Sequence, residues 1–150
     1  MADHDGHRPD LAAMLQPLTR ALIAAELPVL ARHGISMWGY VVLNALDGNP
    51  AGTQGALAQA IGADKTRIIA ILDELQLMGL ISRERDPADR RARLLSITRA
   101  GRELRLAVRA EIQANENRVL TRLPAADRQA FLRAAAALSA LPAEEFTRTA

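Results

Sequence analysis

The 150-residue chain contains no cysteine, and this absence excludes disulfide bonds, thiolate metal sites and cysteine-based peroxide sensing. Aromatic residues make up only 3% of the chain while alanine and leucine are frequent, which favours a mostly helical protein. No run of about 18 apolar residues occurs, so we expect no membrane-spanning helix. The first residues lack the positive charge and apolar run of a signal peptide. The composition therefore favours one cytoplasmic domain, with or without dimerising extensions.

The sequence also lacks the residue groupings of an enzyme. It offers no Ser-His-Asp set, no metal-ligand cluster and no phosphate-binding loop. His33 with Glu26 or Asp47 is the one acid–base pairing that can be proposed, and nothing in the sequence brings these residues together. We therefore predict no catalytic residues, no metal and no cofactor.

Positive charge is concentrated in one segment, residues 83–109. This segment holds nine arginines and four acidic residues, a local charge of +5, although the whole chain carries only +2. The remainder must therefore sum to −3. A basic segment on a nearly neutral protein is typical of a polyanion-binding site, and the alternative is a solvated charged face.

A helix is predicted to begin at Asp64, whose side chain is a good N-cap, and to end at Gly79, which tolerates a left-handed conformation. Apolar residues at three- and four-residue spacing predict one buried stripe, formed by Ile68, Ile71, Leu72, Leu75 and Met78. Thr53 is predicted to cap a shorter helix over residues 54–61, and Gly62 turns the chain between the two. Two such helices describe a helix-turn-helix.

A β-hairpin is predicted directly after this helix-turn-helix. Residues 80–85 and 93–98 read as short strands, and residues 86–91, of sequence DPADRR, form a solvated tip. We call residues 80–98 the wing and residues 86–91 the wing tip. A helix-turn-helix followed by a basic wing predicts a surface that grips DNA.

The remaining pattern is helical. We expect helices over residues 10–33, with a kink or break near Pro28, over 37–46, over 99–123 with Thr98 as its cap, and over 127–141. Residues 1–9 and the tail beyond Pro142 are expected to be loose, and residues 47–52 to form a loop. Trp38 and Tyr40 either anchor the core or line a ligand cavity.

The chain resembles the MarR family of winged-helix transcriptional regulators over nearly its full length. The resemblance is most specific in the segments GLI (79–81), RER (83–85), DPADRR (86–91) and LSITRAG (95–101). Further matches are Ile35-Ser36 with Tyr40, Val42 and Leu43, and Thr53-Gln54 with Leu57 and Ala58.

This resemblance implies a single MarR-like domain over residues 1–150 with a mainly α fold. It implies dimerisation helices over residues 10–33 and 122–146, a winged helix-turn-helix lobe with a two-stranded β wing over 34–98, and a connecting helix over 99–123. The implied function is that of a homodimeric, sequence-specific DNA-binding regulator that represses transcription and is relieved by a small-molecule effector. The implied DNA is a palindromic operator, and the implied location is the bacterial or archaeal nucleoid. The alternative is a winged-helix protein-interaction module without specific DNA binding.

The residues predicted to contact DNA are Ser36, Thr53, Gln54, Asp64, Lys65, Thr66, Arg67, Arg90, Arg91 and Arg93. Lys65 or Arg67 would donate to guanine, and Thr66 would touch a thymine methyl or a phosphate. The wing arginines would neutralise phosphates, one of them in an A·T-rich minor groove.

Other predicted roles are more specific to this sequence. Asp89 is predicted to orient a wing arginine through a bidentate pair. Ile69 and Ala70 stand where many relatives carry a threonine and an arginine, so base reading by this helix is expected to be reduced or shifted. The candidate effector-pocket residues are His33, Met37, Trp38 and Tyr40.

Overall fold

The computed structural model describes residues 8–48 and 52–148, which form two compact units. The first unit runs to Ile112 and the second begins at Gln113, so the boundary falls within one helix, α5 (Arg99–Leu120). In the part of the chain that is described, no helix is both long and apolar enough to cross a lipid bilayer. The predictions for residues 1–7 and 49–51 lie outside the described residues.

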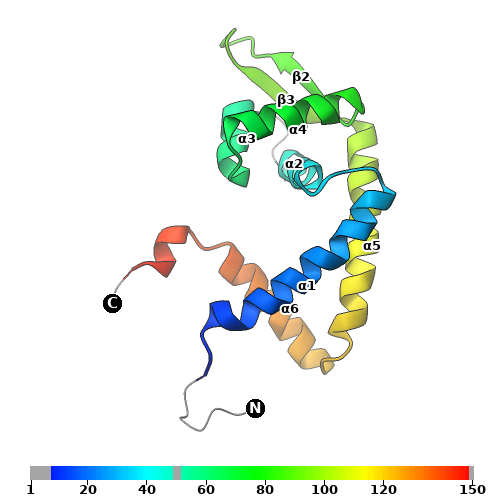
Figure 1. The fold of residues 1–150 in the computed structure, drawn as a ribbon. Helices are drawn as coiled ribbons and strands as arrows, with labels where there is room; N and C mark the ends of the chain where they lie inside the picture. The colour runs from blue at the N-terminus through cyan, green and yellow to red at the C-terminus, as the bar shows by residue number, and fades with distance from the viewer. Residues whose placement is uncertain (1–7, 49–51, 149–150) are drawn as a thin grey trace. The chain divides into compact units, whose positions relative to one another are not determined.

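The first unit is a helical lobe that carries a small antiparallel sheet (Figure 1). Its complete helices are α1 (Leu11–Arg32), α2 (Met37–Gly48), α3 (Gln54–Ile61) and α4 (Lys65–Leu77). Its strands are β1 (Gly52–Thr53), β2 (Ile81–Arg85) and β3 (Arg93–Ile97), in the order β1-β3-β2. The predicted helix-turn-helix and wing strands are therefore confirmed. Strand β1 was not predicted, because two residues are too few to show strand alternation.

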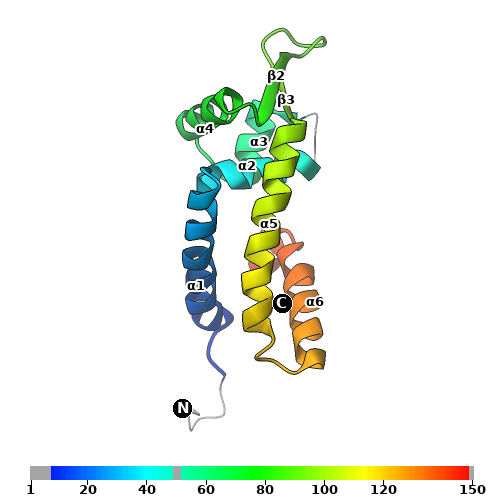
Figure 2. The same cartoon turned by 90° about the vertical axis from the view of Figure 1, so that its right-hand side faces the viewer.

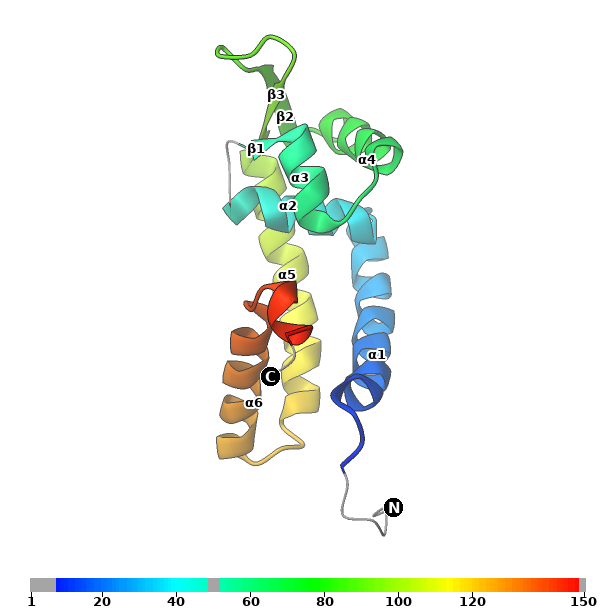
Figure 3. The same cartoon turned by 90° about the vertical axis from the view of Figure 1, so that its left-hand side faces the viewer.

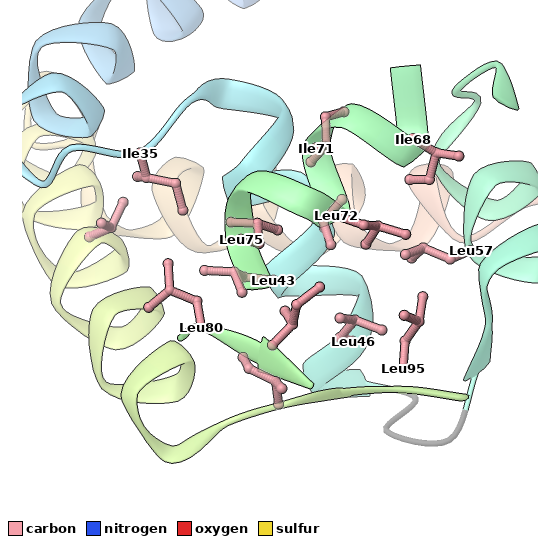
Figure 4. Packing of buried hydrophobic residues seen from close by; sticks show 14 of the residues in the cluster. Ile35, Leu43, Leu46, Leu57, Ile68, Ile71, Leu72, Leu75, Leu80 and Leu95 are labelled. Atoms are coloured by element: carbon pink, nitrogen blue, oxygen red, sulfur yellow. The ribbon is translucent and has the colours of Figure 1, made fainter. Parts of the chain in front are cut away.

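The core of this lobe is built from the predicted apolar stripes (Figure 4). Leu72 and Leu75 of α4 pack with Leu43 and Leu46 of α2, and Leu95 of β3 closes the sheet side of the cluster. Ile68 and Ile71 are buried as expected. Met78 was predicted to belong to the same stripe and is instead 41% exposed, because α4 ends at Leu77 and Met78 is its C-cap.

Helix α1 runs without a break from Leu11 to Arg32 and includes both Pro17 and Pro28. The predicted break near Pro28 is wrong. Each proline removes a single backbone donor from the helical hydrogen bonds. Val29 and Leu30, directly after Pro28, are each only 1% exposed. Their burial in the core holds the helix together through the proline.

The root of the wing is fixed to the start of α5. The Thr98 hydroxyl donates to the Gly79 carbonyl (2.7 Å) and accepts from the backbone N–H of Gly101 (3.1 Å). A Cβ on Gly101 would lie 2.1 Å from the Leu80 carbonyl oxygen, so no other residue fits there without displacing the backbone. The glycine that closes the wing motif is thus explained by close packing.

The second unit contains the end of α5, then α6 (Ala125–Ser139) and a 3-10 turn, η1 (Ala143–Phe146). Both predicted helices, over 99–123 and 127–141, are present, but their ends differ from the prediction. Helix α5 ends at Leu120, and α6 begins directly after Pro124 and ends at Ser139. No residue of α6 is buried. The large apolar side chains left exposed in this unit are Val119, Leu123, Phe131, Leu132, Leu138, Leu141 and Phe146.

Candidate nucleic-acid interface

Helix α4 and the wing lie at the same end of the first unit in all three views (Figures 1, 2 and 3). The first turn of α4 is organised by Asp64, whose carboxylate Oδ1 accepts from the backbone N–H of Arg67 at 2.8 Å. Asp64 is therefore a helix cap, as predicted, and its charge lies at the positive end of the helix dipole. Lys65, Thr66 and Arg67 follow it and are exposed.

The side of α4 opposite the core forms an exposed surface, which we call the outer face of α4. It consists of Thr66, Ile69, Ala70, Asp73 and Leu77. Successive members of this face are one, three or four residues apart, and the buried residues of the stripe lie between them in the sequence. This is the pattern of a helix with 3.6 residues per turn that buries one side. Ile69 is 45% exposed, although it is a large apolar side chain.

The single arginine of α4, Arg67, is engaged within the protein. The Arg67 guanidinium lies over the ring of Trp38 on α2, 5.2 Å from the ring centroid. This is the geometry of a cation–π contact, and it turns Arg67 toward α2. The structure thus gives Arg67 an internal partner that the sequence did not predict. Lys65 is the other cationic side chain of this turn, and it is exposed.

A second arginine ties the wing to α4. Arg83 of β2 forms an ion pair with Asp73, and its Nε donates to the Gln76 side chain at 2.6 Å. Asp73 and Gln76 are three residues apart and therefore neighbours on one side of the helix. The sequence did not predict this contact, because no pattern shows which arginine of the wing contacts α4.

The wing tip is shaped by hydrogen bonds from side chain to backbone. The Asp86 carboxylate accepts from the N–H of Ala88 (2.9 Å), and the Asp89 carboxylate accepts from the N–H of Arg91 (3.0 Å). The prediction that Asp89 holds an arginine side chain in a bidentate pair is corrected, because its partner is the backbone of an Asx turn. Arg90 and Arg91 are exposed, and no ion pair within the described residues joins them to an acidic side chain.

Two more arginines face each other at the base of the wing tip. Arg85 and Arg93 are directly paired across the β2–β3 ladder, an arrangement that is unfavourable without a nearby anion. Arg93 also lines a hollow of about 390 Å³ together with Gln54, Gln76 and Arg83. The predicted DNA contacts Gln54 and Arg93 are thus brought together, beside the N-terminus of α3.

The two predicted hydroxyl contacts are both helix caps. The Ser36 hydroxyl accepts from the N–H of Gly39 (3.0 Å), and the Thr53 hydroxyl accepts from the N–H of Ala56 (3.2 Å). Each hydroxyl therefore lies at a helix N-terminus, where backbone donors favour an anion.

The candidate effector residues have structural roles in the lobe. Met37, Trp38 and Tyr40 are partly buried and pack against the core, which confirms the interpretation of the two aromatic residues as anchors. A role in binding an effector stays a prediction.

His33 joins α1 to α5 through an acidic residue that sequence reasoning missed. The His33 ring and the Arg32 guanidinium contact the two carboxylate oxygens of Glu111 at 2.7 and 2.6 Å. Hydrogen bonds first from Arg32 and then from His33 hold the pKa of the Glu111 carboxyl below its usual range. Among the residues that the structure covers, no group of three His, Cys, Asp or Glu side chains is placed to hold a metal.

Comparison with known proteins shows a similarity to one family. The family model described as "MarR family" matches residues 33–92, which hold α2, the helix-turn-helix and most of the wing. A solved structure described as the transcriptional repressor CouR bound to a 23-mer DNA duplex is 28% identical to this chain, with a TM-score of 0.73. That match covers 87% of this chain and 92% of the other. The chain is similar to MarR-family proteins over residues 33–92 and shares its fold with a DNA-bound relative.

Two further relatives agree with this similarity. The PcaV transcriptional regulator of Streptomyces coelicolor, solved in complex with its natural ligand, is 26% identical with a TM-score of 0.64, over 89% of this chain and 96% of the other. A Thauera aromatica protein named for regulation of the hcr operon is 28% identical over 100 residues, which are 67% of this chain. The match spans 60% of that protein's length. The MarR-type fold of this chain is mainly helical with a small antiparallel sheet in its wing.

Proposed function

We propose that this chain is a homodimeric, sequence-specific DNA-binding regulator that represses transcription and is released by a small-molecule effector. The observation that carries the proposal is that the wing lies at the same end of the lobe as α4 (Figure 3). The wing carries exposed arginines, and the first turn of α4 is exposed. A helix in the major groove with flanking cations on phosphates is a recurrent way of binding duplex DNA.

The division of contacts follows from the side chains. Lys65 and Thr66 would approach base edges from the first turn of α4. Arg90, Arg91 and Arg93 would neutralise phosphates, and one inserted arginine would favour a narrow A·T-rich minor groove. Ser36, Thr53 and Gln54 would place helix N-termini against the phosphate backbone. The DNA duplex bound by the relative CouR supports this arrangement.

A homodimer is supported by apolar side chains that each unit leaves in solvent. On α1 these are Leu11, Met14, Leu15, Ile23 and Leu27, each between 44% and 51% exposed. On α6, Phe131, Leu132 and Leu138 are between 38% and 48% exposed. Apolar surface of this extent marks an interface. Residues 10–33 and 122–146 are accordingly proposed as dimerisation segments around a lobe over 34–98 and a connecting helix over 99–123.

Release by an effector would act through the distance between the two α4 helices of the dimer. A palindromic operator requires two recognition helices about one helical turn apart, roughly 34 Å, so a small change of spacing lowers the affinity. The ligand bound by the relative PcaV supports this regulation. His33, Met37, Trp38 and Tyr40, at the junction of α1 and α2, are the residues proposed to respond to an effector.

Selection of binding sites from random duplexes, together with sedimentation of the purified protein, tests the proposal. The expected result is a dimer at micromolar concentration and an enriched palindrome with half-sites one helical turn apart. A monomer at that concentration, or a failure to bind any duplex in dilute buffer, would contradict it.

A further inference from the structure

The outer face of α4 has few polar groups that are free to read bases. Specific recognition of guanine or adenine uses two-pronged hydrogen bonds from arginine, lysine, asparagine or glutamine side chains. On α4 such side chains are present, but the structure shows that most of them are already engaged. This makes α4 an unusual recognition helix.

Three internal contacts remove these groups. Arg67 lies over Trp38 and so faces α2. The Gln76 side-chain oxygen accepts from Arg83, and the Asp73 carboxylate is paired with the same guanidinium. On the outer face before Asp73, the remaining side chains are Thr66, Ile69 and Ala70, each of which carries a methyl group.

We propose that Ile69 and Ala70, together with the methyl group of Thr66, recognise the 5-methyl groups of thymines in the major groove. The inference rests on the DNA binding proposed above and names the chemistry that α4 reads. Among the four standard DNA bases, thymine alone presents a methyl group in that groove, and apolar side chains contact it directly.

Two observations favour a DNA duplex as the occupant of this apolar face. Ile69 is a large apolar residue that the core leaves 45% exposed. Helix α4, which carries this face, lies at the same end of the lobe as β2 and β3 of the wing (Figure 2). The exposed arginines of the wing carry a charge that complements phosphates. A thymine-rich major groove supplies apolar surface and flanking negative charge together.

The test uses the full-length protein and a duplex obtained by selection from random sequences. Each thymine of one half-site is replaced in turn by deoxyuridine, which removes the methyl group and keeps every hydrogen-bonding group. Burial of one methyl group corresponds to about a fourfold change in affinity. We therefore expect about a fourfold loss at one or two positions and no change at the others.

The variant Ile69→Ala connects that loss to the protein. In this variant the penalty for deoxyuridine should disappear at the position that Ile69 contacts. Met78→Ala is the matched control, because Met78 is similarly exposed (41%) and lies at the other end of the same helix. This control should keep the full penalty.

Two results would overturn the inference. One is tolerance of deoxyuridine at every position, with a strong loss when 7-deazaguanine replaces guanine. The other is a deoxyuridine penalty that Ile69→Ala leaves unchanged. If no duplex is enriched at all, the proposed DNA binding itself fails, and this outcome is distinct from both.

Discussion

The wing tip and the first turn of α4 both carry arginine or lysine, but the two regions differ in how many of these cations are free to meet DNA. At the wing tip, Arg90 and Arg91 extend into solvent from a turn that Asp89 fixes through the backbone. On α4, Arg67 lies over Trp38. The number of cations in a segment therefore does not measure how many can meet DNA, because internal partners decide which are free.

This difference assigns separate tasks to the two regions. Exposed arginines bind phosphates of any sequence and determine salt dependence, whereas side chains at base edges determine sequence preference. We expect the wing to supply most of the affinity and α4 to supply most of the selectivity. Substitutions in each region should separate these two quantities.

The largest effect is expected from Gly101→Ala, which disturbs the root of the wing and spares α4. The added Cβ would lie 2.1 Å from the Leu80 carbonyl oxygen and force apart the junction of β2 and α5. Overpacking of this kind costs about 2–3 kcal/mol of the free energy of unfolding. Urea denaturation measures this loss.

Gly55→Ala is the matched control for that substitution. Gly55 lies in α3, and a Cβ there meets nothing within 4 Å. Its stability should stay equal to the wild type or rise by about 0.5 kcal/mol, because alanine favours a helix. Equal losses in the two variants would show that close packing at Gly101 is unimportant.

Arg83→Ala should weaken binding to every duplex by about tenfold, which corresponds to a coupling of about 1.4 kcal/mol. The substitution removes the side-chain link between β2 and α4 and leaves the Asp73 carboxylate without its partner at the proposed interface. Folding stability should change by less than about 1 kcal/mol, because Asp73 is exposed. Fluorescence anisotropy on a selected duplex measures the affinity.

The double variant Arg83→Ala/Asp73→Ala distinguishes charge repulsion from loss of the tie. Removing the carboxylate should restore part of the lost affinity. If the double variant binds as weakly as Arg83→Ala alone, the unpaired Asp73 carboxylate does not repel DNA.

Lys65→Ala should change which base is preferred at one position of each half-site. A single donor to a base edge is worth about 1 kcal/mol of discrimination, or about fivefold. The base preference at that position should fall while the preferences elsewhere stay the same. Repeating the random-duplex selection with the variant reads this directly, and an unchanged consensus would remove Lys65 from the base contacts.

The smallest effect concerns the link between α1 and α5. Since Arg32 and His33 hold the pKa of Glu111 below its usual range, the carboxylate stabilises the fold above that range, and this contribution is lost as the pH falls. Glu111→Gln should therefore be slightly less stable than the wild type at neutral pH. Denaturation of both proteins at neutral and at acid pH measures this difference in stability, which should vanish in acid. An equal difference at the two pH values would contradict a stabilising role for the Glu111 carboxylate.

Local features of the sequence predicted most of the lobe. Asp64, Thr53 and Thr98 were identified as caps, because capping depends on residues three positions away. The strands of the wing followed from the turn-forming residues 86–91 between two segments that read as short strands. These parts depend on short-range geometry, which a sequence displays directly.

Contacts between distant residues could not be predicted. Glu111 lies 78 residues from His33, and Arg67 and Trp38 are on different helices. No periodicity signals such pairs, since they arise when the core brings two elements together. The availability of each arginine for DNA depends on these contacts, so the sequence alone does not reveal it.

The most direct test is a salt series of DNA affinity for Arg91→Ala, with Arg109→Ala on α5 as a control that removes the same charge. For Arg91→Ala we expect weaker binding to all duplexes and a salt slope reduced by about one, with the ratio of specific to non-specific affinity unchanged. The control should bind as the wild type does. An unchanged affinity and slope for Arg91→Ala would contradict the assignment of the wing to phosphate binding.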